Sequence, residues 1–376
     1  MAGRRLNGEG TVRQRTDGRW EAMVSLPHGR RISRYGATQK EAQAKLKEAR
    51  RQVDDGIDLS ASTMTVEQFL STWIDSAVKP AVKVETYESY ESIVRVRVIP
   101  RIGKVKLLKL SPIRVQQFYA ELALGDDAIS NLSIQHTHRV LKQAMQQAIR
   151  WNMLSRNPCD GVTPPRAERA EMDVWSAAES SALLDTTAEH NMHALYMLAL
   201  STGMRQGELL GLKWNDVDLE GGRLQVHRSL QYQKGNGLVF VEPKTARSRR
   251  PIKLGKRAVD ALKAHRKAQL EIRLKAGSLW QEQDLVFPTD HGAPHDPSWQ
   301  YKVFKRATKD AGLRSIRFHD MRHTAATLLL TKNVHVKVVS EMLGHSSITI
   351  TLNTYSQYVP SLHDEAADVM DSLLSA

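Results

Sequence analysis

The chain has 376 residues, too many for one ordinary hydrophobic core, so two or three domains are expected. It carries 54 Lys and Arg residues against 41 Asp and Glu, which leaves a net charge of +13. This excess favours an anionic polymer as partner, and nucleic acid fits best, although a merely basic enzyme has the same balance.

Cysteine, histidine and apolar patterns exclude several other classes of protein. The single Cys159 cannot form an internal disulfide or a cysteine-rich zinc site, and its surroundings suggest a buried structural thiol in a reducing compartment such as the cytoplasm. No His pair has the spacing of a known metal motif, so no metal is expected. No apolar run approaches the roughly 20 residues that span a membrane, so neither a membrane protein nor a secreted one is expected.

Residues 10–36 show the alternation of short β-strands. Their alternate apolar residues fall on one face, and turn residues occur at Asp17-Gly18 and at 27–29. Thr38 and Glu41 then form a capping box before a helical pattern, so the sequence predicts three strands and one helix. The alternating residues are Trp20, Ala22, Val24 and Leu26, and the helical ones are Ala42, Leu46, Ala49 and Val53.

This small module is rich in arginine. A narrow basic sheet has a shape that can enter a DNA groove, although a plain solvated face has the same composition. The arginines are Arg13, Arg15, Arg19, Arg30, Arg31 and Arg34.

A polar segment at 54–62 leads into a helical region, which begins at a second capping box formed by Thr65 and Gln68. Further helices are expected at 86–98, 112–124 and 134–151. Basic side chains there are available for phosphates: Lys104, Lys106, Lys109, Arg139, Lys142 and Arg150. A charged, Pro-containing linker at 163–172 would then let two domains close around a duplex.

From Val174 onward the pattern is mainly helical. Three strand-like runs interrupt it, at 223–230, 238–241 and 251–254. Beyond Tyr355 an amphipathic tail at 361–376 is too short to be stable alone, so we expect it to dock on another surface.

Near the carboxyl end lies a group of residues suited to phosphoryl transfer. His319 and Arg322 are three residues apart, so on a helix they share one face, where Arg322 can grip a phosphate while His319 handles a proton. Taken alone, such a pair is more often a solvated surface pair. The chain continues to His345, and Tyr355 would supply the attacking oxygen.

Two upstream segments strengthen this interpretation. Arg205 follows Gly203, a residue that can end one helix before the next begins, and it adds a second arginine for a phosphate. Lys244 heads a basic turn between the last two strand-like runs.

The ordered series resembles the tyrosine recombinase family, in the phage and integrative-element integrase branch. The resemblance covers almost the whole chain and rests on Arg205, Lys244, His319, Arg322, His345 and Tyr355. It implies a multidomain protein, mainly α with small β-sheets. Its parts would be an arm-type DNA-binding domain at 1–58, a helical, SAM-like core-binding domain at 63–165, and a mixed but mostly α catalytic domain at 172–376.

The resemblance also implies a role for each residue. Arg205 and Arg322 would stabilise charge on the phosphate, and His345 would donate a hydrogen bond to it. His319 would act as the base for Tyr355, and Lys244 would protonate the departing 5′ oxygen. Because the covalent 3′-phosphotyrosyl bond keeps the energy of the broken one, strands can be exchanged without ATP, metal or cofactor.

Some assignments leave alternatives open. The interval from His345 to Tyr355 is ten residues, where many family members have nine, so Tyr358 is the substitute nucleophile. Glu208 either orients Arg205 or only caps a helix, and His323 is expected to be structural. The rivals of Lys244 are less suited to be acids, because arginines hold their protons and Lys253 lies in a strand. The rival arginines, expected to contact the DNA backbone, are Arg247, Arg249 and Arg250.

The expected function is therefore site-specific recombination of double-stranded DNA by a phage or mobile-element integrase. It would act in the cytoplasm of a bacterial host as a homotetramer on core and arm sites, with a directionality factor and a host DNA-bending protein as possible partners. A type IB topoisomerase shares the chemistry but does not need the amino-terminal module. A DNA-binding regulator with a relic site is the alternative of another class.

Overall fold

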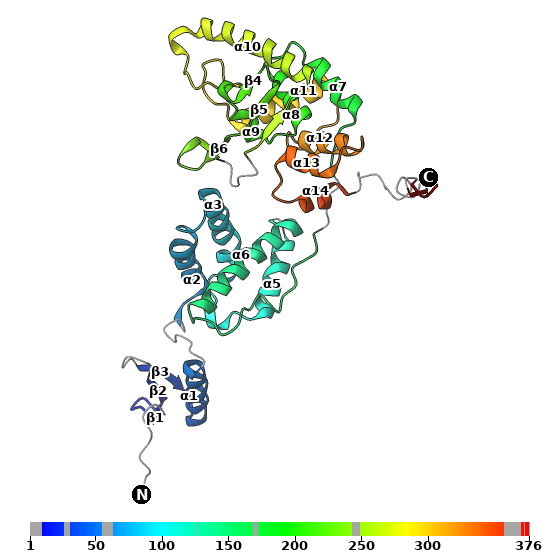
Figure 1. Ribbon diagram of the computed structural model, residues 1–376. Coiled ribbons are helices and arrows are strands. Elements are labelled where there is room, and N and C mark those ends of the chain that lie inside the picture. The colour runs from blue at the N-terminus through cyan, green and yellow to red at the C-terminus, as the bar shows by residue number, and fades with distance from the viewer. Residues whose placement is uncertain are drawn as a thin grey trace. The chain divides into compact units, whose positions relative to one another are not determined.

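The structure, a computed structural model, describes residues 10–25, 31–54, 63–125, 127–167, 172–242, 249–356, 370–371 and 373–375. Its contacts divide the chain into two compact units, Met1–Arg169 and Ala170–Ala376 (Figure 1). Helices predominate in the described parts of both units, and the sheets are small. The predicted fold class, mainly α with an N-terminal three-stranded sheet, is confirmed.

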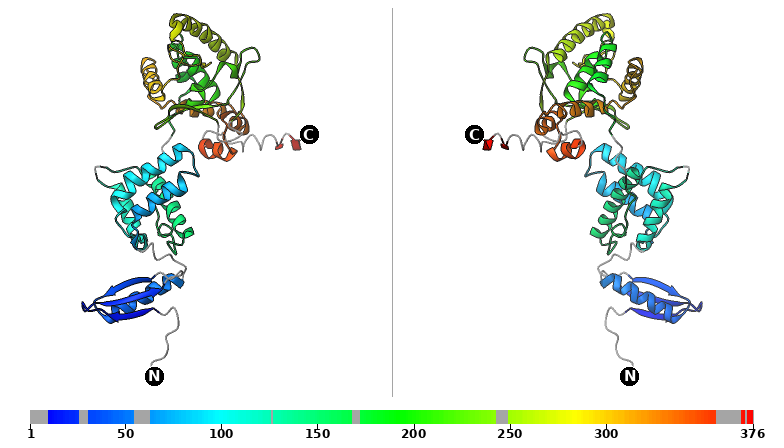
Figure 2. Two further views of the ribbon diagram at one scale, coloured as in Figure 1. Left: turned by 90° about the vertical axis from the view of Figure 1, so that its left-hand side faces the viewer. Right: turned by 90° about the vertical axis from the view of Figure 1, so that its right-hand side faces the viewer.

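The first unit begins with the predicted antiparallel sheet. Its strands β1 (Thr11–Gln14), β2 (Trp20–Ser25) and β3 (Arg31–Gly36) pair in sequence order, and α1 (Gln39–Asp54) packs along one face (Figure 2). Burial of Ala22 and Val24 against this helix follows from the alternation of the strand. Leu26, the predicted turn at 27–29 and Arg30 lie outside the described residues.

The remainder of the first unit is helical. The predicted capping box is present, because Thr65 and Gln68 each bond the other's backbone N–H. The single Cys159 is buried in the core of this region, as predicted. Its helices are α2 (Val66–Trp73), α3 (Val84–Ser92), α4 (Ile99–Ile102), α5 (Pro112–Ala123) and α6 (Asn131–Arg150), with wide π-type turns at Ile74–Val78 and Ile93–Val98 and a short turn at Leu107–Lys109.

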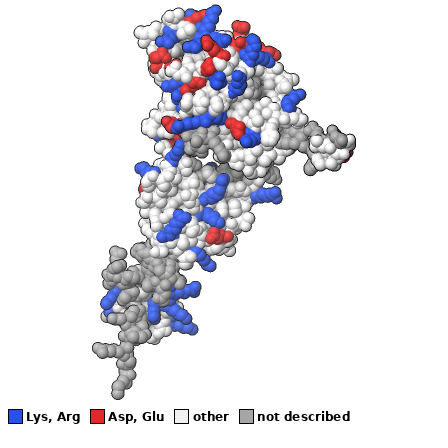
Figure 3. All heavy atoms as spheres, viewed as in Figure 1, with Lys and Arg blue, Asp and Glu red and all other residues white. Residues whose placement is uncertain are grey.

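Basic side chains outnumber acidic ones on the face of this helical region drawn in Figure 3. Arg139, Lys142 and Arg150, which lie on α6, border a groove together with Trp73, the last residue of α2, and the turn that follows it. This groove is a candidate surface for phosphates.

The second unit is mostly helical around small sheets. Its helices are α7 (Ala177–Thr186), α8 (His193–Thr202), α9 (Gln206–Leu210), α10 (Lys256–Ala276), α11 (Pro297–Asp310), α12 (Asp320–Leu330), α13 (Val336–Leu343) and α14 (Ile348–Tyr355), with short turns at Trp214–Asp216 and Gly277–Leu279. Its strands are β4 (Val217–Asp218), β5 (Arg223–Gln225), β6 (Ser229–Gln233), β7 (Gly237–Val241) and β8 (Pro251–Lys253).

One prediction about the strands is wrong in detail, because the run at 223–230 forms two strands in two different sheets. β5 lies between β4 and β8, whereas β6 forms a hairpin with β7. Alternation does not reveal which strand is the partner, so the sequence could not separate the two. As a result, β7 and β8, the strands that flank Lys244 in the sequence, belong to different sheets.

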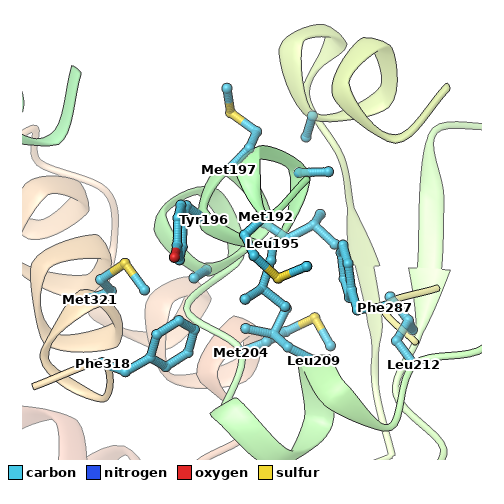
Figure 4. Packing of buried hydrophobic residues seen from close by; sticks show 14 of the residues in the cluster. Met192, Leu195, Tyr196, Met197, Met204, Leu209, Leu212, Phe287, Phe318 and Met321 are labelled. Atoms are coloured by element: carbon cyan, nitrogen blue, oxygen red, sulfur yellow. The ribbon is translucent and has the colours of Figure 1, made fainter. Parts of the chain in front are cut away.

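The core of the second unit is built around α8. This helix is apolar on nearly every side, which is typical of a helix that is buried all round. Phe318 and Met321, at the start of α12, point into the same cluster as Tyr196 of α8 (Figure 4). This packing places the first turn of α12 beside the end of α8, where the predicted site residues converge.

Candidate active site

Three segments of the second unit meet at Arg322, in the first turn of α12. Arg322 is buried and donates hydrogen bonds from Nη1 to the Gly203 carbonyl, 2.6 Å away, and from Nη2 to the Leu343 carbonyl, 2.8 Å away. Gly203 ends α8 with a φ of +62°, as the sequence predicted, and a Cβ there would lie 2.5 Å from the Leu343 side chain. The guanidinium therefore joins the ends of α8 and α13.

Glu208 holds the second arginine. It accepts hydrogen bonds from the Arg205 backbone N–H at 3.0 Å and from Arg205 Nη1 at 2.8 Å, so it both caps α9 and orients the side chain. Glu208 is 4% exposed, whereas the Arg205 side chain is 40% exposed. Glu208 thus fixes the position of Arg205, and the exposed part of the Arg205 side chain can contact a ligand.

Arg250 requires a correction. It was expected to contact the DNA backbone, but it is buried against both carboxylate oxygens of Glu208, at 3.2 and 2.9 Å. Its Nε also donates to the Met342 carbonyl, 2.6 Å away. Burial alone would raise the pKa of Glu208, but Arg250 and Arg205 hold it below its usual range. Glu208 is therefore ionised at neutral pH and pairs with both arginines.

His319 lies at the N-cap of α12 and is exposed, one turn before Arg322. The surrounding protein partly desolvates the ring, and this desolvation, together with the charges of His323 and Arg322, lowers the pKa of His319 to about 4. The imidazole is therefore neutral near pH 7. The helical spacing predicted for His319 and Arg322 is present, because the Arg322 backbone N–H donates to the His319 carbonyl at the start of α12.

His345 is half-buried and follows Gly344, which ends α13 in the left-handed conformation. Its Nδ1 pairs with the Thr351 hydroxyl at 2.7 Å, so the ring is tied to α14. Burial and the positive charges of Arg322, Arg205 and Arg250 lower the pKa of His345 to about 4.

This lowered pKa predicts a loss of stability in acid. An unfolded His has a pKa near 6.5, so between about pH 6.5 and 4 the unfolded chain binds a proton that the folded site rejects. The stability that depends on a neutral His345 is fully present above about pH 6.5 and is lost as the pH falls toward 4. Replacing His345→Gln is expected to flatten this part of the curve of melting temperature against pH.

A matched control is His291→Gln, at an exposed position of the same unit. It should leave the slope unchanged. An unchanged slope in His345→Gln as well would contradict the prediction.

Tyr355, the last residue of α14, is 1% exposed. Burial raises the pKa of its hydroxyl to about 12, although Arg322 acts in the opposite direction. The hydroxyl pairs with Nδ1 of His323, 2.7 Å away. Tyr355 is therefore a protonated phenol at neutral pH, directed toward α12.

The structure thus brings Arg205, His319, Arg322, His345 and Tyr355 together: Arg322 affects the pKa of His319, His345 and Tyr355, and Arg205 affects the pKa of Arg322. Lys244, Arg247, Tyr358 and most of the tail at 361–376 lie outside the described residues. No group of three or more potential metal ligands occurs in the described part of the chain.

For two further residues around this group, Arg250 and His323, the sequence analysis predicted other roles than the contacts that the structure shows. Arg250 has no local signal, because only tertiary packing pairs it with Glu208. His323 does have one: it lies four residues after His319, on the same face of α12.

Comparison with known proteins identifies the class. Residues 175–360 match the phage integrase family, and residues 65–123 match the SAM-like N-terminal domain of phage integrases. A curated relative, the XerC-like tyrosine recombinase of Caldanaerobacter subterraneus, is 33% identical over 90% of this chain and 91% of its own length. The chain therefore belongs to the phage integrase family of tyrosine recombinases, and the predicted enzyme class and function are confirmed.

Further relatives are named integrases. The integrase of Streptomyces ambofaciens is 30% identical over 99% of this chain and 98% of its own, and the ICEBs1 integrase of Bacillus subtilis is 25% identical over 97% and 100%.

Solved structures share the fold. The Tn1549 transposon integrase in complex with transposon right-end DNA superposes with a TM-score of 0.71 at 23% identity, over 83% of this chain and 100% of that one. A lambda integrase tetramer bound to a Holliday junction gives 0.56 at 18%, over 95% and 97%. Within the described residues, no helix has the length and apolarity to cross a membrane.

Proposed function

We propose that this recombinase inserts and excises a phage or integrative element, with Tyr355 as the nucleophile that joins DNA through a 3′-phosphotyrosyl bond. The observation that carries the proposal is the site around the buried Arg322, which is bonded to the ends of α8 and α13, while the buried Tyr355 hydroxyl lies 2.7 Å from His323 on the same helix as Arg322. Relatives named as integrases over nearly the whole chain support the mobile-element role.

In the proposed reaction the Tyr355 oxygen bonds to phosphorus and the bond to the 5′ oxygen breaks. Arg205 and Arg322 stabilise the charge that builds on the nonbridging oxygens, and His345 donates a hydrogen bond through its other ring nitrogen. The tyrosine proton leaves toward the α12 histidines, among which the family resemblance gives His319 the base role. Lys244 supplies the proton that the 5′ oxygen takes up.

The proposed domain roles follow the same boundaries. Residues 1–58 would bind arm sites through the exposed arginines of the sheet, among them Arg13, Arg19 and Arg31. Residues 63–165 would bind core sites, which the SAM-like match at 65–123 supports, and 172–376 would carry catalysis. Four copies would act on two DNA sites, with accessory directionality and bending proteins, inside a bacterial host. The lambda integrase tetramer on a Holliday junction supports that assembly.

The test is covalent trapping on nicked duplexes that carry candidate attachment sites. Wild-type protein is expected to form a 3′ adduct that survives denaturing gels, and Tyr355→Phe is expected to form none because the attacking oxygen is missing. Tyr232→Phe, at an exposed tyrosine of β6, is the matched control and should react like wild type.

Other outcomes separate the alternatives. An adduct in both wild type and Tyr355→Phe would assign the nucleophile to another tyrosine, first Tyr358. Binding of DNA without any adduct in either protein would favour a regulator. Relaxation of supercoils by a monomer, without strand exchange between sites, would favour a topoisomerase.

A further inference from the structure

His323 occupies a place in this site that the assignment of roles leaves open. Its Nδ1 lies 2.7 Å from the Tyr355 hydroxyl, a short hydrogen-bond distance, and the two ring centroids are 5.6 Å apart. The residue was expected to be structural, yet it touches the oxygen that would attack the phosphate. His319, the expected base, instead meets His323 edge-on, with ring centroids 5.2 Å apart.

The direction of this hydrogen bond follows from its surroundings. A tyrosine buried to 1% exposure keeps its proton at neutral pH, so its hydroxyl is available as a donor. Burial also lowers the pKa of His323, with a smaller contribution from Arg322, so the ring is neutral and one nitrogen can accept. The phenol O–H therefore donates to Nδ1, and the His323 proton sits on Nε2.

We propose that His323 is the immediate proton acceptor for Tyr355. His319 lies beyond it, in edge-on contact with the His323 ring. This inference rests on the proposed function and concerns the same site. As the Tyr355 oxygen bonds to phosphorus and the bond to the 5′ oxygen breaks, the phenol proton moves to Nδ1 of His323. In the reverse step a 5′ hydroxyl attacks phosphorus and gives its proton back to Lys244, and His323 returns its proton to the leaving tyrosine.

The charges around His323 suit a transient imidazolium. Asp320, at the start of α12, acts to favour the protonated ring, while Arg322 and Arg317 oppose it. Asp320 is buried, and both its oxygens are held by Arg317. Nearby positive charge therefore keeps the protonated state short-lived, which is what a reversible exchange requires.

The experiment compares His323→Asn, His323→Ala and His319→Asn in single-turnover adduct formation on nicked attachment-site duplexes. The Asn amide stands close to the position of Nδ1, so it preserves a hydrogen bond to Tyr355 but cannot carry a proton away. Each reaction is repeated on DNA with sulfur in place of the bridging 5′ oxygen, because a thiolate leaves without needing a proton. Lys244→Ala is the control for the leaving-group side.

Both His323 variants are expected to slow adduct formation by about 10²–10⁴-fold, the usual contribution of a general base, and sulfur should not restore the rate. Sulfur should restore Lys244→Ala. Unchanged DNA binding and melting temperature in His323→Asn would show that its fold is intact, so the test holds even if His323→Ala misfolds.

Three results would overturn the proposal. A wild-type rate in His323→Asn would reduce the contact to positioning. Rescue of the His323 variants by sulfur would move their role to the leaving group. A loss in His319→Asn with none in His323→Asn would return the base role to His319. Failure of the proposed function is distinguishable, because wild type would then form no adduct on either DNA.

Discussion

Replacing Arg322→Lys is expected to slow covalent adduct formation by about 10²–10³-fold, the usual cost of removing one donor that stabilises charge in a transition state. Burial lowers the pKa of Arg322 to about 9, which still leaves the guanidinium charged at neutral pH. Each terminal nitrogen uses one hydrogen on a backbone carbonyl, so a second remains for a phosphate oxygen. A lysine ammonium keeps the charge but cannot span the Gly203 and Leu343 carbonyls and a phosphate together.

The measurement is the single-turnover rate on nicked duplex, with DNA affinity followed separately. Arg306→Lys is the matched control, since Arg306 is an 86% exposed side chain on α11 whose ion pair is long, at 3.8 Å. It should react at the wild-type rate. A wild-type rate in Arg322→Lys would show that charge alone suffices, without the planar fork.

Replacing Arg250→Met is expected to lower the free energy of unfolding by about 3–5 kcal/mol, because it leaves the buried Glu208 carboxylate without its main partner. The side chains of Arg250 and Glu208 are 6% and 4% exposed, so water cannot solvate the carboxylate that loses its partner. Arg205 would remain paired with Glu208, but the link from Glu208 to the Met342 carbonyl and α13 would be gone. Adduct formation should therefore fall together with stability.

A double-mutant cycle in denaturant separates the pair from the rest of the site. Adding Glu208→Gln to Arg250→Met removes the orphaned charge, so the double variant should lose less stability than the sum of the single ones. Arg249→Met is the control, because Arg249 is exposed and pairs with the exposed Glu242. Strict additivity of the two buried substitutions would mean that the pair is not coupled.

Local features of the chain could be predicted because they depend on neighbours in sequence. Thr65 and Gln68 form the predicted capping box, and Gly203 ends α8 before Arg205. Both features depend on only a few adjacent residues. The strand run at 223–230 was misread because its first half, β5, pairs with the distant β8, whereas its second half belongs to β6, which forms a local hairpin with β7. Long-range pairing of this kind leaves no periodic signal.

The sequence by itself determined the class of enzyme, the order of its parts and the identities of five residues that meet in the described site. It could do so because the chemistry needs particular side chains, and those recur in a fixed order. Only the tertiary structure decided that Arg250 supports Glu208 from within and that Tyr355 rests on His323. The physical reason is that burial and hydrogen-bond partners depend on how α12, α13 and α14 pack, and packing joins residues that are distant in the chain.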